Sequence, residues 1–353
     1  MLRRYLPAAL LALAPLTPLA AQSADSLPLA ALLNRPEVAR YLEYFTGPAR
    51  DRMARWLTRS TRYQSLIADR LDEAGLPEEF GSLPLIESGV SNGAVSRSGA
   101  VGMWQFLPAT AREYGLRVDR WVDERRDPFR ATDAAIRHLS DLKNRFASEP
   151  LLAAAAYNGG MGRVGRSLAR LRLDPADSGA ANPFFALTEQ GLLPRETSNY
   201  VPQMLAAAAI ARDPARYGFT VDTMPPEFVD SVHVPRPIQL AAAERALGLD
   251  RLTLAELNPQ FVRGVTPPGG SWLRVPAGYG DELVGRLASL PVVSLVRHER
   301  RATLGKLIWV KRGDSLGDLA KRYGVNETEL RRANALPNWY RIRAGQALRL
   351  PAP

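Results

Sequence analysis

The stretch that decides the fold reads LPLIES at residues 83–88 and, after a loop, GMWQFLPAT at residues 102–110. The first segment places one carboxylate, Glu87, at the end of an apolar run. A carboxyl group against apolar walls is costly to ionise, so its pKa rises towards neutrality, as a general acid requires at physiological pH. Because most glutamates lie on the surface, this pattern alone more often marks an exposed glutamate at a helix end.

Around these segments, residues 61–218 have the periodicity of helices interrupted by glycine-rich loops. Asp127-Pro128 is typical of a helix start, and the apolar residues that follow recur with helical spacing as far as Phe146. An alanine-dense helix is expected next, ended by Gly159-Gly160. We therefore expect a mainly helical region, with helices at residues 128–146, at residues 150–158 and from about residue 198 to residue 208.

Four short segments form a series along the chain: Glu87-Ser88, AVSRSGAVGMWQFLPAT at residues 94–110, AYNGG at residues 156–160 and ETSNYVP at residues 196–202. In this order they resemble the catalytic motif of the soluble-lytic-transglycosylase family, and most closely its membrane-bound lytic transglycosylase D subgroup, which carries carboxy-terminal LysM modules. The resemblance covers most of the chain and is strongest over residues 80–115. It implies a mainly α (α+β), lysozyme-like catalytic domain over residues 61–218.

The resemblance also implies a reaction. Members of the family cleave the β-1,4 bond between N-acetylmuramic acid and N-acetylglucosamine in peptidoglycan glycan strands, with no cofactor and no metal. No water enters the products, because the muramyl 6-hydroxyl attacks its own anomeric carbon and leaves a 1,6-anhydro end. Glu87, carried over as the sole catalytic acid, would protonate the leaving oxygen and later take the proton from that hydroxyl.

A single catalytic carboxylate agrees with an absence in the sequence, since no Asp or Glu occurs between Glu87 and Thr110. Ordinary glycosidases need two carboxyl groups that flank the bond, whereas an N-acetyl group of the substrate supplies the nucleophile in substrate-assisted families. Asp119 or Glu196 could still fold close to Glu87. The pattern therefore favours one acid and leaves a second carboxylate open.

The resemblance further implies substrate-binding roles for seven motif residues, namely Ser88, Ser96, Met103, Gln105, Tyr157, Asn158 and Tyr200. The Gln105 amide offers a sugar both a donor and an acceptor. The phenol of Tyr200 could reach Glu87 or the muramyl unit. Structural roles stay open at the same positions: Ser88 and Asn158 could cap helix ends, and Met103 could pack in the core.

Residues 305–353 have the order strand, helix, helix, strand, and they resemble a LysM domain, a small βααβ unit that binds N-acetylglucosamine-containing glycans in a shallow groove. By family position, the groove would be lined by Gly313, Asp314, Ser315, Leu316 and Asn334. Asp314 and Ser315 could also cap the first helix of the unit. Residues 219–290 resemble a degenerate LysM copy between proline-rich linkers, and both glycan binding and packing against the catalytic domain stay open for it.

Residues 1–21 have the three-part pattern of a secretory signal: the basic pair Arg3-Arg4, an apolar run from Tyr5 to Leu16, and the small residues Ala20-Ala21. The apolar run is too short for a membrane span. Gln22 stands where a bacterial lipoprotein carries its lipidated cysteine, so no lipid attachment is expected. We predict an exported, periplasmic protein with no membrane span after signal cleavage, in which residues 22–60 form a polar, partly helical approach segment.

Composition and charge narrow the function further. The 353 residues include no Cys and three scattered His, which excludes thiolate nucleophiles and argues against a zinc site. Much of the net charge of +10 falls in residues 300–353, which hold twelve Lys or Arg and four Asp or Glu. A basic module fits a polyanionic partner. Because export argues against nucleic acid, we expect an acidic cell-wall polymer as the partner of a monomeric protein.

Three other functions stay open on the sequence alone. A muramidase on the same fold would cleave the same bond with water, and the mass of the products separates the two reactions. A catalytically dead domain would leave a cell-wall-binding scaffold, although the presence of Glu87 with all four segments argues against it. Nucleic-acid binding would use the same Lys and Arg residues, but no nucleic-acid-binding fold is recognised beside them.

Overall fold

The structure is a computed structural model that describes residues 29–147, 149–172, 182–224, 228–293, 307–311, 313–334, 336 and 342–350. The chain divides into two compact units, the first formed by Met1–Val229 and Ala255–Arg263, the second by Asp230–Leu254 and Gly264–Pro353. The predicted signal peptide, residues 1–21, lies outside the described residues. No helix in the described ranges has both the length and the apolar character that crossing a membrane requires.

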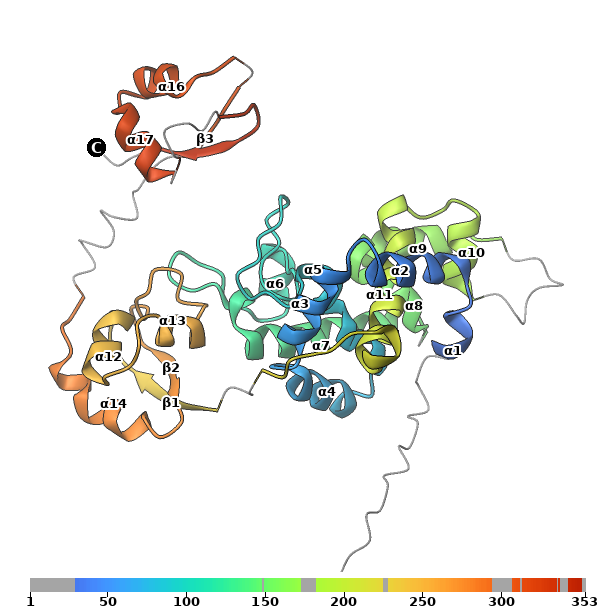
Figure 1. Cartoon of the computed structure of the whole chain (residues 1–353), viewed down its shortest axis with the longest axis horizontal. Helices are drawn as coiled ribbons and strands as arrows, with labels where there is room; N and C mark the ends of the chain where they lie inside the picture. Colours follow the sequence, from blue (N-terminus) through green and yellow to red (C-terminus); the bar gives the residue numbers. More distant parts are fainter. Residues whose placement is uncertain are drawn as a thin grey trace, which may run out of the picture. The chain divides into compact units, whose positions relative to one another are not determined.

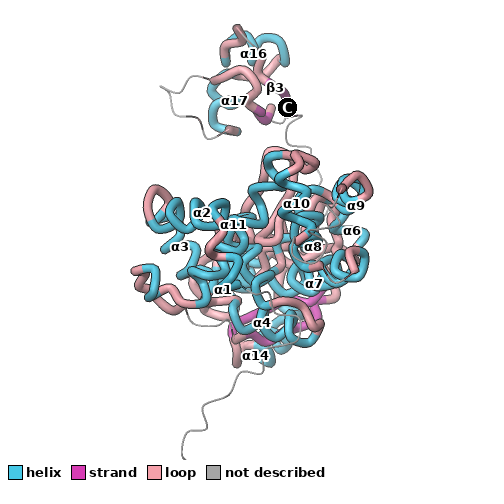
Figure 2. The backbone as a smooth tube through the Cα atoms, turned by 90° about the vertical axis from the view of Figure 1, so that its right-hand side faces the viewer, coloured by secondary structure: helices cyan, strands magenta, loops and turns pink. Residues whose placement is uncertain are grey.

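The first unit is built from helices joined by loops (Figure 1; Figure 2). In chain order its elements are α1 (Leu29–Leu32), α2 (Pro36–Thr46), α3 (Arg50–Ser60), α4 (Gln64–Glu73), η1 (Glu78–Ser82), α5 (Leu83–Ser88), α6 (Pro108–Glu113), η2 (Glu124–Arg126), α7 (Pro128–Arg145), α8 (Pro150–Gly159), α9 (Met161–Leu168), α10 (Pro183–Glu189), α11 (Arg195–Arg212) and η3 (Ala215–Tyr217). Helix α11 packs against α2, α5, α8 and η1, so its apolar residues form the centre of the core.

Local sequence explains where the long helices begin. The Asp127 carboxylate caps α7 as predicted, because it accepts hydrogen bonds from the backbone N–H groups of Phe129 and Arg130 at 3.0 and 3.1 Å. Helix α8 ends at the predicted glycine pair. Helix α11 begins at Arg195, ahead of the predicted start, because Pro194 supplies the extended residue that precedes the first turn.

Helices α2 and α3 are part of the first unit rather than an approach segment. They contribute Val38, Phe45, Met53 and Leu57 to the same buried core as α7, α8 and α11. The expected separation of residues 22–60 from the catalytic domain is therefore wrong for these helices. The polar residues that indicated a separate segment occupy the solvent-facing side of amphipathic helices, while the apolar side is buried.

The segment Ala255–Arg263 groups with the first unit, although the sequence assigns it to the degenerate LysM copy. The backbone N–H of Asp123 donates to the Gln260 carbonyl at 2.9 Å. The Arg263 guanidinium lies 4.7 Å from the centre of the Trp121 ring, a cation–π arrangement. These two contacts fix the segment against the loop that precedes α7.

Two small α+β modules follow in the chain. The first contains β1 (Val229–Val234), α12 (Leu240–Ala246), α13 (Thr253–Leu257), β2 (Ser271–Pro276), α14 (Gly280–Arg286) and η4 (Leu287–Ser289). Strands β1 and β2 pair in a two-stranded sheet, as expected for a LysM-like copy. Helix α14 is an addition that the sequence pattern did not predict.

The last module contains β3 (Leu307–Trp309), α16 (Leu316–Tyr323), α17 (Glu327–Ala333) and β4 (Ala347–Arg349). The strands are antiparallel, with Ile308 opposite Leu348, and both side chains are buried with Leu319 and Leu330 in a small core of their own. The predicted order of strand, helix, helix and strand is therefore confirmed.

Candidate active site

Glu87 lies near the end of α5, a short helix whose other residues are largely buried. The helix ends at Gly89, where φ is 62° and the N–H returns to the Leu85 carbonyl. A Cβ atom at Gly89 would lie 2.0 Å from Nε1 of Trp56 on α3. Only glycine fits this close approach and this backbone conformation, so packing against α3 fixes the helix end that carries Glu87.

The Glu87 carboxyl group is partly buried and contacts one tyrosine. The phenol of Tyr200, on α11, donates a hydrogen bond to Oε1 of Glu87 at 2.6 Å. Burial raises the pKa of Glu87 from 4.5 to about 7; the Tyr200 hydrogen bond lowers this pKa, and the negative charge of Glu196 raises it. At neutral pH a large fraction of the molecules therefore holds a protonated Glu87, which is the form that a general acid uses.

Tyr157 lies close enough to Glu87 for the two groups to interact electrostatically, and it belongs to an aromatic cluster. The Tyr157 hydroxyl, at the end of α8, donates to the Trp104 carbonyl at 2.8 Å. The Tyr157 ring lies 6.5 Å from the Phe106 ring and 5.1 Å from the His138 ring. Burial raises the pKa of Tyr157 and lowers the pKa of His138 to about 4, so both groups are uncharged at neutral pH. Tyr157 and His138 therefore add no charge to this aromatic cluster at neutral pH.

The structure places Ser88 and Met103 in supporting positions. The Ser88 hydroxyl donates to the Met103 carbonyl at 2.9 Å and accepts from the Ser91 N–H at 3.0 Å, so it ties the end of α5 to the following loop. The expected sugar contact of the Met103 side chain is wrong, because that side chain has no exposed surface. Its flexible apolar chain fills the core, where burial stabilises it.

Ser96 and Gln105 shape the loop between α5 and α6. The Ser96 hydroxyl accepts from the Ala100 N–H at 3.0 Å. Gln105 has a φ of 50°, and its Nε2 donates to the Gly102 carbonyl at 2.7 Å. Each of these two side chains thus makes a hydrogen bond within the loop, and substrate binding by Ser96 and Gln105 stays a prediction.

Asn158 joins the end of α8 to the first turn of α11. Its Oδ1 accepts a hydrogen bond from Oγ1 of Thr197, a buried residue, at 3.1 Å. A Cβ atom at Gly159 would lie 2.7 Å from the same Thr197 oxygen, which explains the glycine at this position. The contact brings the third and fourth motif segments together, while a sugar contact of Asn158 stays a prediction.

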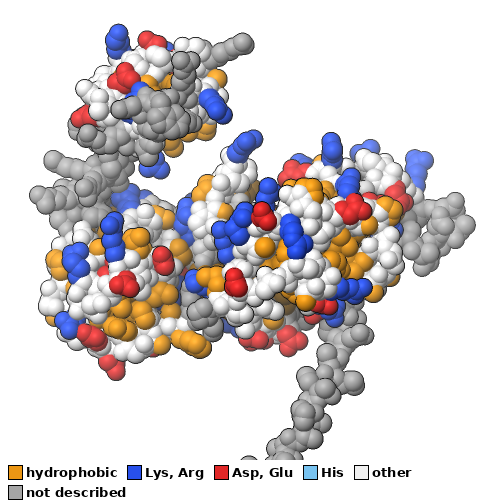
Figure 3. Space-filling model, in the orientation of Figure 1, with side chains coloured by type: hydrophobic (Ala, Val, Ile, Leu, Met, Phe, Trp, Pro, Cys, Tyr) orange, Lys and Arg blue, Asp and Glu red, His pale blue; other side chains and the backbone are white. Residues whose placement is uncertain are grey.

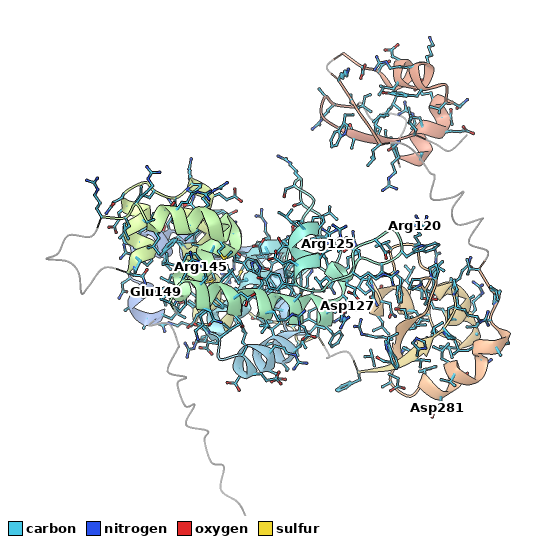
Figure 4. All side chains as sticks on the ribbon, turned by 180° about the vertical axis from the view of Figure 1, so that it is seen from behind. Arg120, Arg125, Asp127, Arg145, Glu149 and Asp281 are labelled. Atoms are coloured by element: carbon cyan, nitrogen blue, oxygen red, sulfur yellow. The ribbon has the colours of Figure 1, made fainter. Side chains whose placement is uncertain are left out.

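A buried ion pair that the sequence did not reveal holds the motif loop. Nε and Nη2 of Arg125 donate to the two carboxylate oxygens of Asp123 at 2.8 and 2.9 Å, and Arg125 is only 6% exposed. Its Nη1 donates to the carbonyls of Gly99 and Phe106 at 2.9 and 3.0 Å. Figure 4 shows Arg125 near the start of α7. In the sequence, residues 123–127 resemble an ordinary solvated run of charges.

The other carboxylates considered in the sequence do not touch the Glu87 carboxyl in the structure. Asp119 accepts hydrogen bonds from two backbone N–H groups of its own loop and pairs with Arg117 at 2.6 Å. Glu196 is exposed and acts on Glu87 through its charge. Across the described residues, His, Asp and Glu side chains form no group of three placed to hold a metal ion.

In the last module, the predicted groove residues at the start of α16 have partners within the protein. Gly313 has a φ of 92°, a backbone conformation that favours glycine, so it has a structural role in the turn before α16. Asp314 accepts from the Lys311 N–H and from the Arg322 guanidinium, both at 2.8 Å, and the Arg322 hydrogen bond is the main cause that lowers the pKa of Asp314. The Ser315 hydroxyl caps α16. Glycan binding by this loop stays a prediction.

Leu316 and Asn334 also support the module. Leu316 is buried in its small core. The Asn334 amide donates to the Arg349 carbonyl at 2.8 Å and accepts from the Arg349 N–H at 2.6 Å, which joins the end of α17 to β4. These contacts position the loop after α17, and a direct contact of Leu316 or Asn334 with glycan stays a prediction.

Three family models match the chain. Residues 66–174 match the Transglycosylase SLT domain, residues 228–292 match the Lytic transglycosylase MltD, LysM-like domain, and residues 309–351 match the LysM domain. The first match contains Glu87 and the second and third motif segments.

Curated relatives of this chain carry transglycosylase names. Membrane-bound lytic murein transglycosylase D of Escherichia coli (strain K12) is 32% identical over 300 residues, which cover 83% of this chain and 64% of that protein. Peptidoglycan transglycosylase gp16 of Escherichia phage T7 is 37% identical over 116 residues, which cover 33% of this chain and 8% of that protein. The chain thus spans less than two thirds of the length of either relative.

Among solved structures, the 70 kDa soluble lytic transglycosylase of Escherichia coli aligns with a TM-score of 0.37 and 24% identity, over 44% of this chain and 25% of that chain. The domain matches fall on the segments that carry the resemblance, and they occur in the same order along the chain. The chain therefore contains a Transglycosylase SLT domain followed by a LysM-like domain and a LysM domain, and it is similar over most of its length to Membrane-bound lytic murein transglycosylase D.

Proposed function

We propose that this protein is an exported lytic transglycosylase that cleaves the bond between N-acetylmuramic acid and N-acetylglucosamine in peptidoglycan and leaves 1,6-anhydro ends. The observation that carries the proposal is the partly buried hydrogen bond from Tyr200 to Glu87, at a position where burial raises the pKa of Glu87 to about 7. The matched SLT domain and the similarity to these relatives support the substrate class, because the relatives are named for murein and peptidoglycan.

In the proposed reaction, Glu87 acts twice. In its protonated form it gives its proton to the glycosidic oxygen as the sugar–sugar bond breaks. The carboxylate then accepts a proton from the muramyl 6-hydroxyl as that oxygen bonds to the anomeric carbon. The acid is restored without water, and a pKa near the working pH suits both steps. The N-acetyl group of the substrate can supply the neighbouring nucleophile, so no second protein carboxylate is needed.

The LysM-type modules and the predicted signal extend the proposal. The last module would bind glycan and hold the enzyme on the cell wall, and the excess of positive charge in residues 300–353 fits an acidic polymer. The pattern of residues 1–21 supports export to the periplasm, and Gln22 in place of cysteine supports a protein without a lipid anchor.

The mass of the products tests this function. Purified peptidoglycan sacculi digested in ¹⁸O-labelled water are expected to release muropeptides that are lighter by one water than hydrolysis products and carry no label. Sacculi that are digested with lysozyme in parallel should give labelled reducing ends, because lysozyme cleaves the bond with water. Labelled ends from this protein would make it a muramidase, and wall binding without soluble products would make it a scaffold.

Tyr200→Phe is expected to change the pH dependence of the proposed reaction. The Tyr200 hydrogen bond lowers the pKa of Glu87, so its removal raises that pKa further. Activity that requires protonated Glu87 is present below this pKa and is lost as the pH rises through it. The alkaline limb of kcat/KM should therefore move to higher pH, with kcat reduced about 10-fold by loss of orientation.

Tyr157→Phe is the matched control, because the Tyr157 hydroxyl donates its hydrogen bond to the Trp104 carbonyl and not to Glu87. The alkaline limb of kcat/KM should lie at the same pH in Tyr157→Phe as in the wild type. A limb that moves equally in both variants, or in neither, would contradict the role of Tyr200.

A further inference from the structure

The segment Ala255–Arg263 follows α12 in the chain and precedes β2, yet it groups with the first unit and not with the second. We refer to it as the docking segment. Its residues Asn258, Gln260 and Phe261 are each at most 5% exposed, so the middle of the segment is buried. A buried segment that groups with a distant part of the chain can shape the loop that it contacts there.

The residues that flank the docking segment are held within the second unit. The Leu254 N–H donates to Oε1 of Glu244 on α12 at 2.9 Å, and the Leu240 N–H donates to the Gly264 carbonyl at 2.9 Å. Both ends of the docking segment are therefore fixed. Fixed ends lower the conformational entropy that the segment loses when its middle is buried.

The docking segment contacts the loop of residues 117–126, which we call the support loop. Figure 4 labels Arg120 and Arg125, two residues of this loop. The Asp123 N–H donates to the Gln260 carbonyl at 2.9 Å. Both residues are buried, so water competes poorly for this hydrogen bond, and breaking it is costly for the buried N–H group.

A cation–π contact joins the same two segments. The Arg263 guanidinium lies 4.7 Å from the centre of the Trp121 ring, and Trp121 is 4% exposed. Shielding from water strengthens the attraction between the ring and the cation. The Arg120 guanidinium lies 5.6 Å from the same ring, but Arg120 is exposed and belongs to the support loop itself. Of these two cations, Arg263 is the one that ties the support loop to the docking segment.

The support loop in turn holds the motif loop, residues 94–106. Nη1 of Arg125 donates to the carbonyls of Gly99 and Phe106. Gly102 has a φ of 85°, and a Cβ atom at this position would overlap the Arg125 carbonyl oxygen. The two backbones are therefore in direct contact at Gly102, and a displacement of the support loop displaces the motif loop.

Two carbonyls of the motif loop accept hydrogen bonds from groups close to Glu87. The Met103 carbonyl accepts from the hydroxyl of Ser88, the residue after Glu87, and the Trp104 carbonyl accepts from the Tyr157 hydroxyl. Burial and then the charge of Glu87 raise the pKa of Tyr157, so these two groups lie close enough to interact. A shift of the motif loop would change the orientation of both hydroxyl groups, and catalytic rates depend steeply on such geometry.

We infer that the docking segment is a positioning element of the active site, in which Arg263 is a positioning residue that acts through Trp121 and the support loop. This inference rests on the proposed function, because it takes Glu87 to be the acid. Arg263 acts at a distance and is not itself a catalytic residue. The degenerate LysM copy then serves the reaction whether or not it binds glycan.

The test compares the full-length wild type with Arg263→Ala and with the control Arg251→Ala, which removes the same charge from an exposed position of the second unit. Figure 3 shows Lys and Arg side chains at many places on the visible surface, so the loss of one positive charge is by itself a small change. On peptidoglycan, Arg263→Ala is expected to lower kcat about 5-fold, with KM changed less than about 2-fold. Arg251→Ala should match the wild type in both constants.

The pH profile separates positioning from an effect of charge on the acid. The alkaline limb of kcat/KM should lie at the same pH in Arg263→Ala as in the wild type, because the hydrogen bond from Tyr200 to Glu87 joins α11 to α5 without the support loop. A displaced limb would overturn the inference. Wild-type kcat in Arg263→Ala, or an equal loss in Arg251→Ala, would also overturn it.

Hydrogen exchange of the folded proteins tests the same inference without turnover. In Arg263→Ala, the N–H groups of Val101, Gly102 and Gln105, which donate to carbonyls within the motif loop, should exchange about 5-fold faster. The N–H groups in the middle of α11 should exchange as in the wild type. Unchanged exchange in the motif loop, or faster exchange in both places, would overturn the inference. A wild type that releases no soluble products would instead overturn the proposed function, and the exchange rates would still show whether Arg263 holds the motif loop.

Discussion

Glu87→Gln is expected to lower the turnover of peptidoglycan about 10³-fold, because the amide cannot give a proton to the leaving oxygen. The amide oxygen can still accept the hydrogen bond that Tyr200 donates to Oε1 in the wild type. The fold and wall binding should therefore survive. Release of soluble muropeptides from sacculi measures the first effect, and co-sedimentation with sacculi measures the second.

The same substitution is expected to make the protein more stable at high pH. The folded pKa of Glu87 is raised from 4.5 to about 7, so between these values the folded state holds a proton that the unfolded chain has released. The free energy of unfolding therefore falls as the pH rises through this window, by about 3 kcal/mol in total. Gln does not titrate, so Glu87→Gln should be about 3 kcal/mol more stable above pH 7 and equal to the wild type below pH 4.5.

Glu113→Gln is the matched control, since Glu113 is an exposed carboxylate of the same unit. It should leave turnover unchanged, and its unfolding should follow the wild-type pH dependence. If Glu87→Gln kept wild-type turnover, another group would be the acid. If its stability showed the wild-type pH dependence, the Glu87 carboxyl would have an ordinary pKa.

Arg125→Ala is expected to destabilise the first unit by about 3 kcal/mol, because it removes the two short hydrogen bonds to the buried Asp123 carboxylate and leaves that carboxylate only the longer contact with Arg126 at 3.8 Å. Asp123 is 8% exposed, so water reaches it poorly. The substitution also removes the two hydrogen bonds that Arg125 donates to the carbonyls of Gly99 and Phe106. The motif loop should then lose its fixed conformation, and kcat/KM should fall even where the protein is still folded. Denaturant unfolding and activity assays measure the two effects.

Arg130→Ala is the control for this prediction. Arg130 pairs with Glu124 at 3.6 Å and its side chain is 59% exposed, so the pair is screened by water. Its loss should cost less than about 1 kcal/mol. A similar small cost for Arg125→Ala would show that the buried pair does not hold the loop.

The parts of the fold that the sequence predicted depend on local signals. The start of α7 follows from Asp127, whose side chain caps the first turn whatever packs against the helix. The end of α8 follows from the glycine pair after Asn158. The last module was predicted because turn residues, caps and apolar runs alternate over short distances.

The features that the sequence missed depend on contacts between distant segments. Arg125 is buried because the carbonyls of Gly99 and Phe106 close over it, and no local pattern separates such an arginine from its exposed neighbours. Met103 stands in the motif beside residues expected to touch sugar, yet its side chain turns into the core. Tyr200 was expected near Glu87 on resemblance alone, because 113 residues separate the two positions.

The proposed reaction depends most directly on the pKa of the Glu87 carboxyl group. With ¹³C-carboxyl glutamate incorporated, NMR titration of the folded protein should give one resonance that Glu87→Gln removes, with a midpoint near pH 7. The alkaline limb of kcat/KM should share that midpoint. A midpoint near 4.5, the value of an ordinary glutamate, would contradict the assignment of Glu87 as the acid.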